Sequence, residues 1–211
     1  MIKAWHGINW PNRISLMRLL MVPPFVVLLM KQQQWGPARY MAMAIFFIMA
    51  VSDFLDGILA RRLNVRTRLG AILDPLADKV LIICSAVLLS LPGSSPPGAQ
   101  LSDWIVVAIV GKDLWVIIGF LVIYLVTDRF LVRPSVAGKA CTVAQLVMVL
   151  LVLLAPDLNA LRAGLGSQVA DWMSWIVAGM CALAVLSYTR MGLVFVGHEG
   201  KPLEEGGGKS S

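Results

Sequence analysis

Four aspartates stand between positions 53 and 78 of a largely apolar chain: Asp53, Asp56, Asp74 and Asp78. The first two are three residues apart and the last two are four apart, so on helices each pair would share one face. Carboxylate oxygens are the ligands that Mg²⁺ and Mn²⁺ prefer, whereas Zn²⁺ prefers nitrogen and sulfur. If the two helices are antiparallel neighbours, the four side chains predict a site for divalent cations.

The cost of burying these charges supports the same interpretation. A carboxylate at the middle of a membrane span costs roughly 2.5 to 3.5 kcal/mol, and carboxylates close together also repel one another. Arg61 and Lys79 could neutralise at most two of the four. A role as helix cap fits Asp74, which precedes Pro75. It does not fit Asp53 and Asp56, which lie at the C-terminal end of an apolar stretch, where the helix dipole disfavours anions. We therefore expect bound cations to supply the missing positive charge.

The elements that must position these aspartates are membrane helices. The chain is 58% hydrophobic and 14% charged, with a mean hydropathy of +0.79, which excludes an ordinary water-soluble surface. A helix needs about 20 mostly apolar residues to cross the hydrocarbon core. Six stretches come close, at 14–30, 38–60, 71–91, 103–126, 136–155 and 172–196. The predicted fold is an all-α integral membrane protein with six transmembrane helices.

The domain organisation follows from these stretches. Residues 1–13 are expected to form an interfacial N-terminal segment, 14–196 the six-helix membrane catalytic domain, and 197–211 a disordered polar tail. Turn-rich linkers are predicted at 92–102 and 156–171. The three cysteines lie in apolar runs without metal-ligand spacing, which predicts small buried side chains rather than a disulfide framework.

The basic residues predict the orientation in the membrane. With six spans both termini share one side, which carries eleven Lys and Arg against three on the other. Positive charge concentrates on the cytoplasmic side, so both termini and the connections near 61–70 and 127–135 are predicted to be cytoplasmic. This distribution, in a bacterial inner membrane or an organelle membrane, suits an anionic lipid surface. No basic domain exists to hold nucleic acid.

Small residues and an arginine interleave with the aspartates. The composite pattern reads Asp53-x2-Asp56-Gly57-x2-Ala60-Arg61-x8-Gly70-x3-Asp74-x3-Asp78. At every position it resembles the signature of the CDP-alcohol phosphatidyltransferases. These integral membrane enzymes transfer a phosphatidyl group from CDP-diacylglycerol to an alcohol, or a phosphoalcohol from its CDP ester to a lipid. The six spans are similar to the usual architecture of that family, so the resemblance covers most of the chain.

The resemblance implies a role for each aspartate. Asp53, Asp56 and Asp74 would hold two divalent ions, Mg²⁺ or Mn²⁺. Asp78 would also lie near the ions and would act as the base. In such a site the ions neutralise the pyrophosphate and stabilise the leaving CMP, while a carboxylate accepts the proton of the attacking hydroxyl.

The other positions of the pattern would contact the nucleotide. Gly57, Ala60 and Arg61 would line the nucleotide and pyrophosphate site, and Gly70 would keep the third helix close. The resemblance also implies CDP-diacylglycerol as a substrate, a site at the cytoplasmic membrane surface, and a homodimer. Arg18 resembles an arginine that approaches the site in the family, although such a side chain could instead snorkel towards lipid headgroups.

The acceptor alcohol depends on weaker signals. Lys112 and Asp113 lie inside the fourth stretch, and Arg133 and Lys139 follow on the cytoplasmic side. They represent either an ion pair with ordinary loop charges or a basic pocket for an acceptor phosphate, with Arg133 and Lys139 as its ligands. Phosphatidylglycerophosphate synthases of the family carry Arg-Glu in the fourth span, whereas the run from Arg133 to Lys139 is more similar to cardiolipin synthases. We therefore expect phosphatidylglycerol as the acceptor, with glycerol-3-phosphate as the alternative.

An ion-coupled transporter is the alternative of another class, because acidic residues within membrane spans often mark an ion path. A transporter is expected to distribute such charges across the membrane or to break its helices at the midplane. Here the four aspartates share one side. The pattern favours an enzyme.

Overall fold

The computed structural model describes the backbone of residues 10–63, 68–127 and 135–199 and, within these ranges, the side chains of 17–52, 79–119, 121–122 and 135–193. This part of the chain forms six helices and no strand. They are α1 (Trp10–Lys31), α2 (Gly36–Leu63), α3 (Arg68–Ser90), α4 (Asp103–Thr127), α5 (Val136–Leu161) and α6 (Leu165–Glu199). Each coincides with one of the six predicted stretches, so the all-helical prediction is confirmed.

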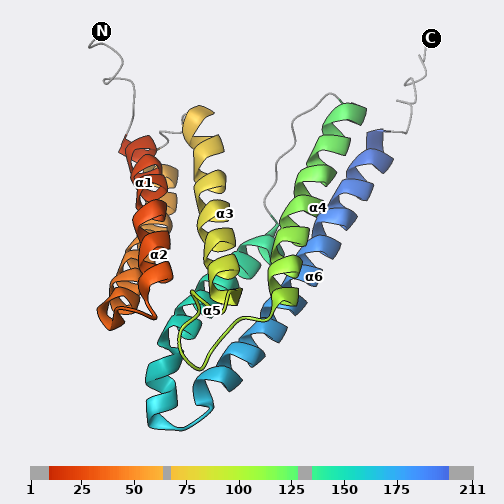
Figure 1. Ribbon diagram of the computed structural model, residues 1–211. Coiled ribbons are helices and arrows are strands. Elements are labelled where there is room, and N and C mark those ends of the chain that lie inside the picture. The colour runs from red at the N-terminus through yellow and green to blue at the C-terminus, as the bar shows by residue number, and fades with distance from the viewer. Residues whose placement is uncertain (1–9, 64–67, 128–134, 200–211) are drawn as a thin grey trace, which may run out of the picture.

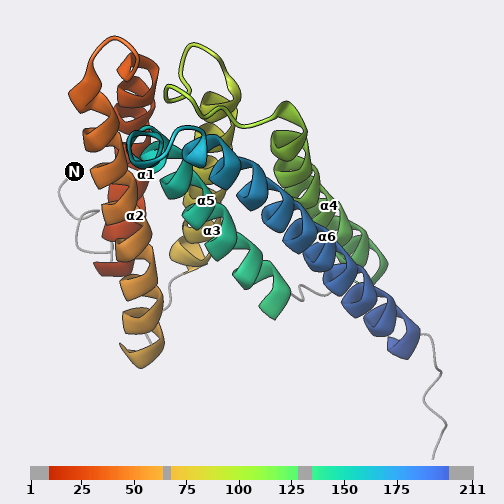
Figure 2. The same cartoon turned by 90° about the horizontal axis from the view of Figure 1, so that it is seen from below.

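The helices form two groups that α5 joins (Figure 1). Helix α1 packs against α2 and α3, α4 packs along α6, and α5 contacts α6 most extensively while also touching α2 and α3. Figure 2 shows α5 between the α1–α3 group and the α4–α6 pair. The C-terminal end of α2 and the N-terminal end of α3 therefore belong to one group, at the end of the molecule where α1 begins.

An apolar core holds the helices in this arrangement. All six contribute buried side chains to it, for example Phe25, Phe46, Leu81, Ile109, Met148 and Val177. The rings of Phe25 and Phe46 lie with their centroids 5.6 Å apart and fasten α1 to α2. Tilted aromatic pairs of this kind add stabilisation beyond the area that they bury.

The predicted linker at 92–102 is confirmed as the connection between α3 and α4, and it is held in place. The side-chain amide of Gln32, at the end of α1, donates to the carbonyl oxygen of Ser94. The amide of Gln33 donates to the carbonyl oxygen of Ser95 at 3.0 Å. These bonds satisfy the carbonyls of two buried residues, Ser94 and Ser95, and hold the connection to the end of α1.

The predicted linker at 156–171 is wrong, because α5 continues past Pro156 to Leu161 and only a short turn precedes α6. A proline removes one helical hydrogen bond, and tertiary contacts stabilise the helix beyond it. The side-chain carbonyl of Asn159 accepts a hydrogen bond from the Gly166 amide at 2.7 Å. Gly164 adopts a φ of 80°, a left-handed conformation that favours glycine and reverses the chain.

Two of the six helices, in the part of the chain with described side chains, are long and apolar enough to cross a membrane. They are Val136–Leu161 and Leu165–Leu193. Helices α2 and α3 contribute the shorter apolar stretches Gly36–Ser52 and Lys79–Ser90. The six helices thus lie where spans were predicted, while membrane crossing by the other four remains a prediction.

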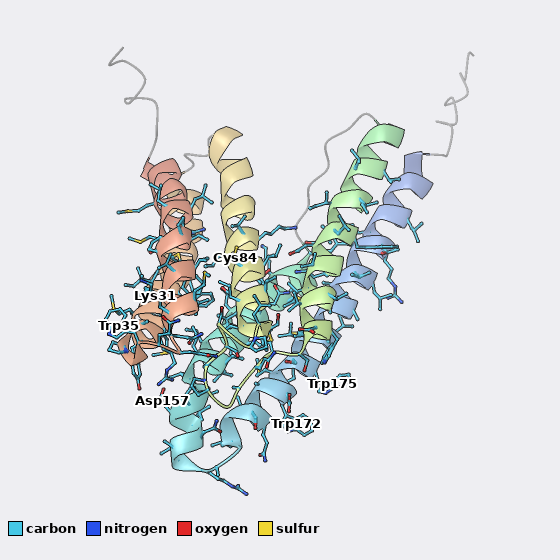
Figure 3. The ribbon with its side chains drawn as sticks, in the orientation of Figure 1. Lys31, Trp35, Cys84, Asp157, Trp172 and Trp175 are labelled. Carbon is cyan, nitrogen blue, oxygen red and sulfur yellow. The ribbon has the colours of Figure 1, made fainter. Side chains whose placement is uncertain are left out.

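Four of the five tryptophans with described side chains gather at the end of the molecule away from the start of α1, while the fifth, Trp115, is exposed in the middle of α4. Trp35 follows α1, Trp104 begins α4, and Trp172 and Trp175 lie on α6; all four are exposed. The rings of Trp104 and Trp175 are 4.8 Å apart, and Figure 3 shows Trp35, Trp172 and Trp175 in the lower half of the view. Because tryptophan is enriched where membrane meets water, this end is suited to one membrane interface.

Candidate active site at the ends of α2 and α3

The backbone places the aspartate pattern on two helices. Asp53 and Asp56, with Gly57, Ala60 and Arg61, lie in the C-terminal part of α2, and Gly70, Asp74 and Asp78 lie in the N-terminal part of α3. Both segments are helical, so the three- and four-residue spacings put each pair on one helix face as predicted. The side chains of 53–78 lie outside the described residues. Their distances and the metal-ligand roles of the four aspartates therefore remain predictions.

The described residues that flank the pattern form a small cavity. Met49 and Ala50 precede Asp53 by about one turn, and Leu81 and Ile82 follow Asp78 by about one turn. These four side chains line a cavity of about 10 Å³ together with Arg18 of α1 and with Thr142 and Leu146 of α5. This volume suits about one water molecule. The pattern thus lies next to a junction of α1, α2, α3 and α5.

Arg18 is buried at this junction, with only 3% of its surface exposed. It therefore does not snorkel to the lipid headgroups, the alternative raised by the sequence. A guanidinium keeps its charge in any protein environment, and a buried charge is tolerated where other groups compensate it. The arginine brings a fixed positive charge to the side of the cavity formed by α1.

The start of α5 explains part of the run from Arg133 to Lys139. Ser135 caps the helix, and its hydroxyl accepts a hydrogen bond from the Gly138 amide at 2.9 Å. A Cβ at Gly138 would lie 2.6 Å from the Tyr188 hydroxyl of α6, so glycine allows this close approach. Ser135 therefore caps the helix, and Gly138 allows close packing of α5 against α6. The similarity of this run to cardiolipin synthases did not reveal these structural roles.

Of the two predicted acceptor ligands, the structure describes only Lys139. Lys139 is exposed in the first turn of α5. It lies three residues before Thr142, which lines the cavity, so the two share a helix face. Arg133 lies outside the described residues. An acceptor role for either residue remains a prediction.

Lys112 and Asp113 form the ion pair that was one of the two interpretations of their sequence. The Lys112 ammonium lies 3.1 Å from Oδ1 of Asp113. The Lys79 ammonium of α3 lies 3.2 Å from the same oxygen. Lys79 was named with Arg61 as able to neutralise at most two of the four aspartates, and the structure shows that Asp113 of α4 is a partner of its ammonium.

A second charged cluster, which the sequence analysis missed, lies at the opposite end of α2. The Arg39 guanidinium binds both carboxylate oxygens of Asp157 in α5, at 2.7 and 3.0 Å. It also donates to the Leu153 carbonyl oxygen at 2.8 Å, and the Tyr40 hydroxyl donates to Asp157 at 2.8 Å. Figure 3 shows Asp157 near the turn that carries Trp35. In the sequence, Asp157 directly after Pro156 was the available signal for a partner of Arg39.

The cysteines are buried or half-buried, as predicted. Cys141 and Cys181 place their sulfurs 3.5 Å apart across the α5–α6 contact. The side-chain amide of Gln145 donates to the Cys181 sulfur at 3.6 Å. Among the described side chains, no group of three or more His, Cys, Asp or Glu could hold a metal ion. The aspartate pattern lies outside that set.

Comparison with known proteins identifies the family. The family model described as CDP-alcohol phosphatidyltransferase matches residues 8–187, which include the complete aspartate pattern and the junction around it. The chain belongs to the CDP-alcohol phosphatidyltransferase family. It is therefore an enzyme, which excludes the transporter alternative, and the family together with the two apolar helices makes it a membrane protein.

Three curated relatives of this phosphatidyltransferase carry the name CDP-diacylglycerol--glycerol-3-phosphate 3-phosphatidyltransferase. The Bacillus subtilis (strain 168) protein is 32% identical over 69% of this chain and 77% of its own length. The Aquifex aeolicus (strain VF5) protein is 37% identical over 64% and 69%. The Escherichia coli (strain K12) protein is 33% identical over 74% and 83%.

Proposed function

We propose that this enzyme transfers the phosphatidyl group of CDP-diacylglycerol to a hydroxyl of glycerol-3-phosphate and releases CMP. The observation that carries the proposal is the similarity to relatives whose names specify this donor and this acceptor, over most of both chains. The first expectation, phosphatidylglycerol as the acceptor, has no support among these relatives. It rested on the run from Arg133 to Lys139 and on the absence of an Arg-Glu pair, but Lys112-Asp113 keeps the same order of charges as that pair.

The chemistry of the donor set fits a pair of Mg²⁺ or Mn²⁺ ions. Four carboxylates on two helices that share α1 as a neighbour offer only oxygen, which these ions prefer. Asp53, Asp56 and Asp74 would hold the ions, with Asp78 beside them. Bound there, the ions would neutralise the pyrophosphate of the substrate.

Residues of the chain carry out proton transfer and bind the nucleotide. Asp78 accepts the proton of the glycerol hydroxyl as that oxygen bonds to the phosphatidyl phosphorus and the bond to CMP breaks. The side chain of Arg61 and the small residues Gly57, Ala60 and Gly70 bind the nucleotide and pyrophosphate. This division rests on the family pattern.

The acceptor phosphate requires positive charge close to the site. Lys139 supplies it from the first turn of α5, one turn from the cavity, and Arg133 precedes it in the chain. Glycerol-3-phosphate carries close to two negative charges and no acyl chain, so cationic ligands dominate its binding. The exposure of Lys139 leaves its ammonium accessible to such a soluble acceptor.

The location of the site supports the same proposal. The aspartate pattern lies towards the end of the bundle opposite the four exposed tryptophans described above, which exclude Trp115. A substrate with two acyl chains and a charged nucleotide can meet a catalyst only at a membrane surface. With the positive charge of the adjoining loops, this surface is the cytoplasmic one, and both termini share that side. A homodimer, usual in the family, completes the proposed assembly.

The test is CMP release by the purified protein with CDP-diacylglycerol, a divalent metal and one acceptor at a time. Turnover is expected with glycerol-3-phosphate and not with phosphatidylglycerol. Turnover with phosphatidylglycerol alone would instead show a cardiolipin synthase. Turnover with neither would contradict the proposed acceptor while leaving the family unchanged.

A further inference from the structure

Two buried thiols meet where α5 packs against α6. Cys141 of α5 and Cys181 of α6 place their sulfurs 3.5 Å apart, and these residues are 0% and 3% exposed. The contact between the two helices is the most extensive in the described part of the chain, so the fold itself holds the sulfurs together. Neither residue has a part in the proposed transfer reaction.

The distance between the sulfurs is short enough for a covalent bond to form after a small movement. A disulfide has a sulfur–sulfur distance of about 2.0 Å, so the two atoms need to approach by about 1.5 Å. Rotation of the two side chains, together with a small shift between the helices, covers this distance. The third cysteine, Cys84, is half-buried on α3 and lies outside this contact.

A buried amide accompanies the two sulfurs. Gln145 lies one turn after Cys141 on α5, is 1% exposed, and donates from its side-chain nitrogen to the Cys181 sulfur at 3.6 Å. Burial of an amide costs free energy unless the amide is hydrogen-bonded, and a thiol sulfur is only a weak acceptor. An oxidised sulfur that carries an oxygen atom would accept a stronger hydrogen bond from the same nitrogen. The amide therefore suits an oxidised form of the pair better than the reduced form.

The burial of the sulfurs determines which class of oxidant reaches them. A large charged oxidant such as glutathione disulfide has no access to residues that are 0% and 3% exposed. Hydrogen peroxide is small and uncharged. Thr142, the neighbour of Cys141 in the chain, already lines a cavity whose volume suits about one water molecule. The site thus favours a peroxide over a thiol–disulfide reagent.

We propose that Cys141 and Cys181 form a modification site, a dithiol that hydrogen peroxide converts to a disulfide between α5 and α6. Peroxide transfers one oxygen to the first thiol, which becomes a sulfenic acid, and leaves as water. The second sulfur then attacks the sulfenic sulfur, the S–S bond forms, and the hydroxyl leaves with the second thiol proton as water. The two thiols lose two electrons and two protons, and one peroxide is reduced to two waters. The Gln145 amide binds the sulfenic oxygen between the two steps.

The test treats the reduced full-length protein in detergent with hydrogen peroxide, stops the reaction with catalase, and alkylates the denatured protein with N-ethylmaleimide. Mass spectrometry after digestion is expected to show one linked peptide that contains Cys141 and Cys181, with Cys84 alkylated. Dithiothreitol should restore all three thiols. Alkylation of both Cys141 and Cys181 after peroxide, or a link from either to Cys84, would overturn the proposal.

Thermal unfolding provides a second measurement on the same samples. The oxidised protein should melt at a higher temperature than the reduced protein, because a cross-link between residues 40 positions apart restricts the unfolded chain. Dithiothreitol should reverse the shift. A linked peptide without a rise in the melting temperature would contradict the conclusion that the bond fastens α5 to α6.

A pair of variants tests the role of the amide. Gln145→Leu should slow formation of the linked peptide by about fivefold, the scale of one lost hydrogen bond. Ser174→Ala is the matched control, because Ser174 is also buried but donates to the Ala170 carbonyl of its own helix at 2.8 Å. It should leave the rate unchanged. An unaltered rate in Gln145→Leu, or equal slowing in both variants, would overturn the role of Gln145.

Discussion

Replacement of Arg39 by methionine should weaken the contact between α2 and α5. The change keeps most of the apolar stem and removes the guanidinium, which makes two bonds to Asp157 at 2.7 and 3.0 Å and one to the Leu153 carbonyl at 2.8 Å. It also removes a charge that lies 4.4 Å from the centre of the Tyr40 ring. This cluster is remote from the aspartate pattern, so the effect should be on stability and not on metal binding.

The exposure of the two side chains determines how much their ion pair contributes to the free energy of unfolding. The Arg39 side chain is 11% exposed and the Asp157 side chain 41%, so solvent screens the pair from one side. A fully exposed pair contributes about 0 to 1 kcal/mol, and a hydrogen bond to a charged group about 1.5 to 3 kcal/mol. We expect Arg39→Met to lower the free energy of unfolding by about 2 kcal/mol, in the lower part of the range for a hydrogen bond to a charged group, because solvent screens the pair.

The assay is equilibrium unfolding in mixed micelles for Arg39→Met, Asp157→Asn and the double variant. Asp157→Asn should also destabilise, because it leaves a nearly buried guanidinium without its carboxylate. The double variant should lose less than the sum, with a coupling of about 1 kcal/mol or more between residues in direct contact. Lys31→Met, which removes an exposed charge at the same end, is the control. Additive losses would refute the conclusion that the pair joins the two helices.

The candidate site and the packing provide four further predictions. Excess chelator should abolish CMP release, with recovery on adding Mg²⁺ or Mn²⁺, since the pyrophosphate needs cations; undiminished release would contradict the metal site. Asp78→Asn should lower kcat by about 10²-fold or more while Mn²⁺ binding persists, because a positioned base contributes on that scale; near-normal turnover would contradict its role as the base. Lys139→Ala should raise the KM for glycerol-3-phosphate by about tenfold or more and leave that for CDP-diacylglycerol unchanged, as expected for loss of a charge-assisted contact; equal changes in both would exclude a specific acceptor role. Gly166→Ala should destabilise by about 1 to 3 kcal/mol in equilibrium unfolding, because its Cβ would collide with the backbone oxygen of Ala155, whereas Gly179→Ala on the same helix meets open space and serves as the control.

The amino-acid sequence by itself determined the helices and the nature of the candidate site. Uninterrupted apolar stretches have few ways to satisfy their backbone groups in lipid, so their positions predict helices without knowledge of packing. The α3–α4 connection was also predictable, because its prolines and glycines exclude a continued helix. The spacing of the four aspartates indicated the family, since that pattern depends only on residue types and the helical repeat.

Only the tertiary structure decided which partner each charged side chain takes. Lys79 is adjacent in sequence to Asp78 but binds Asp113, and Arg39 binds an aspartate more than a hundred residues away. The continuation of α5 past Pro156 likewise depends on contacts made by Asn159 with α6. A long side chain can reach several acids, and a proline costs only a few kcal/mol, so packing between helices selects the outcome. Local sequence does not contain that information, because the deciding atoms belong to other helices.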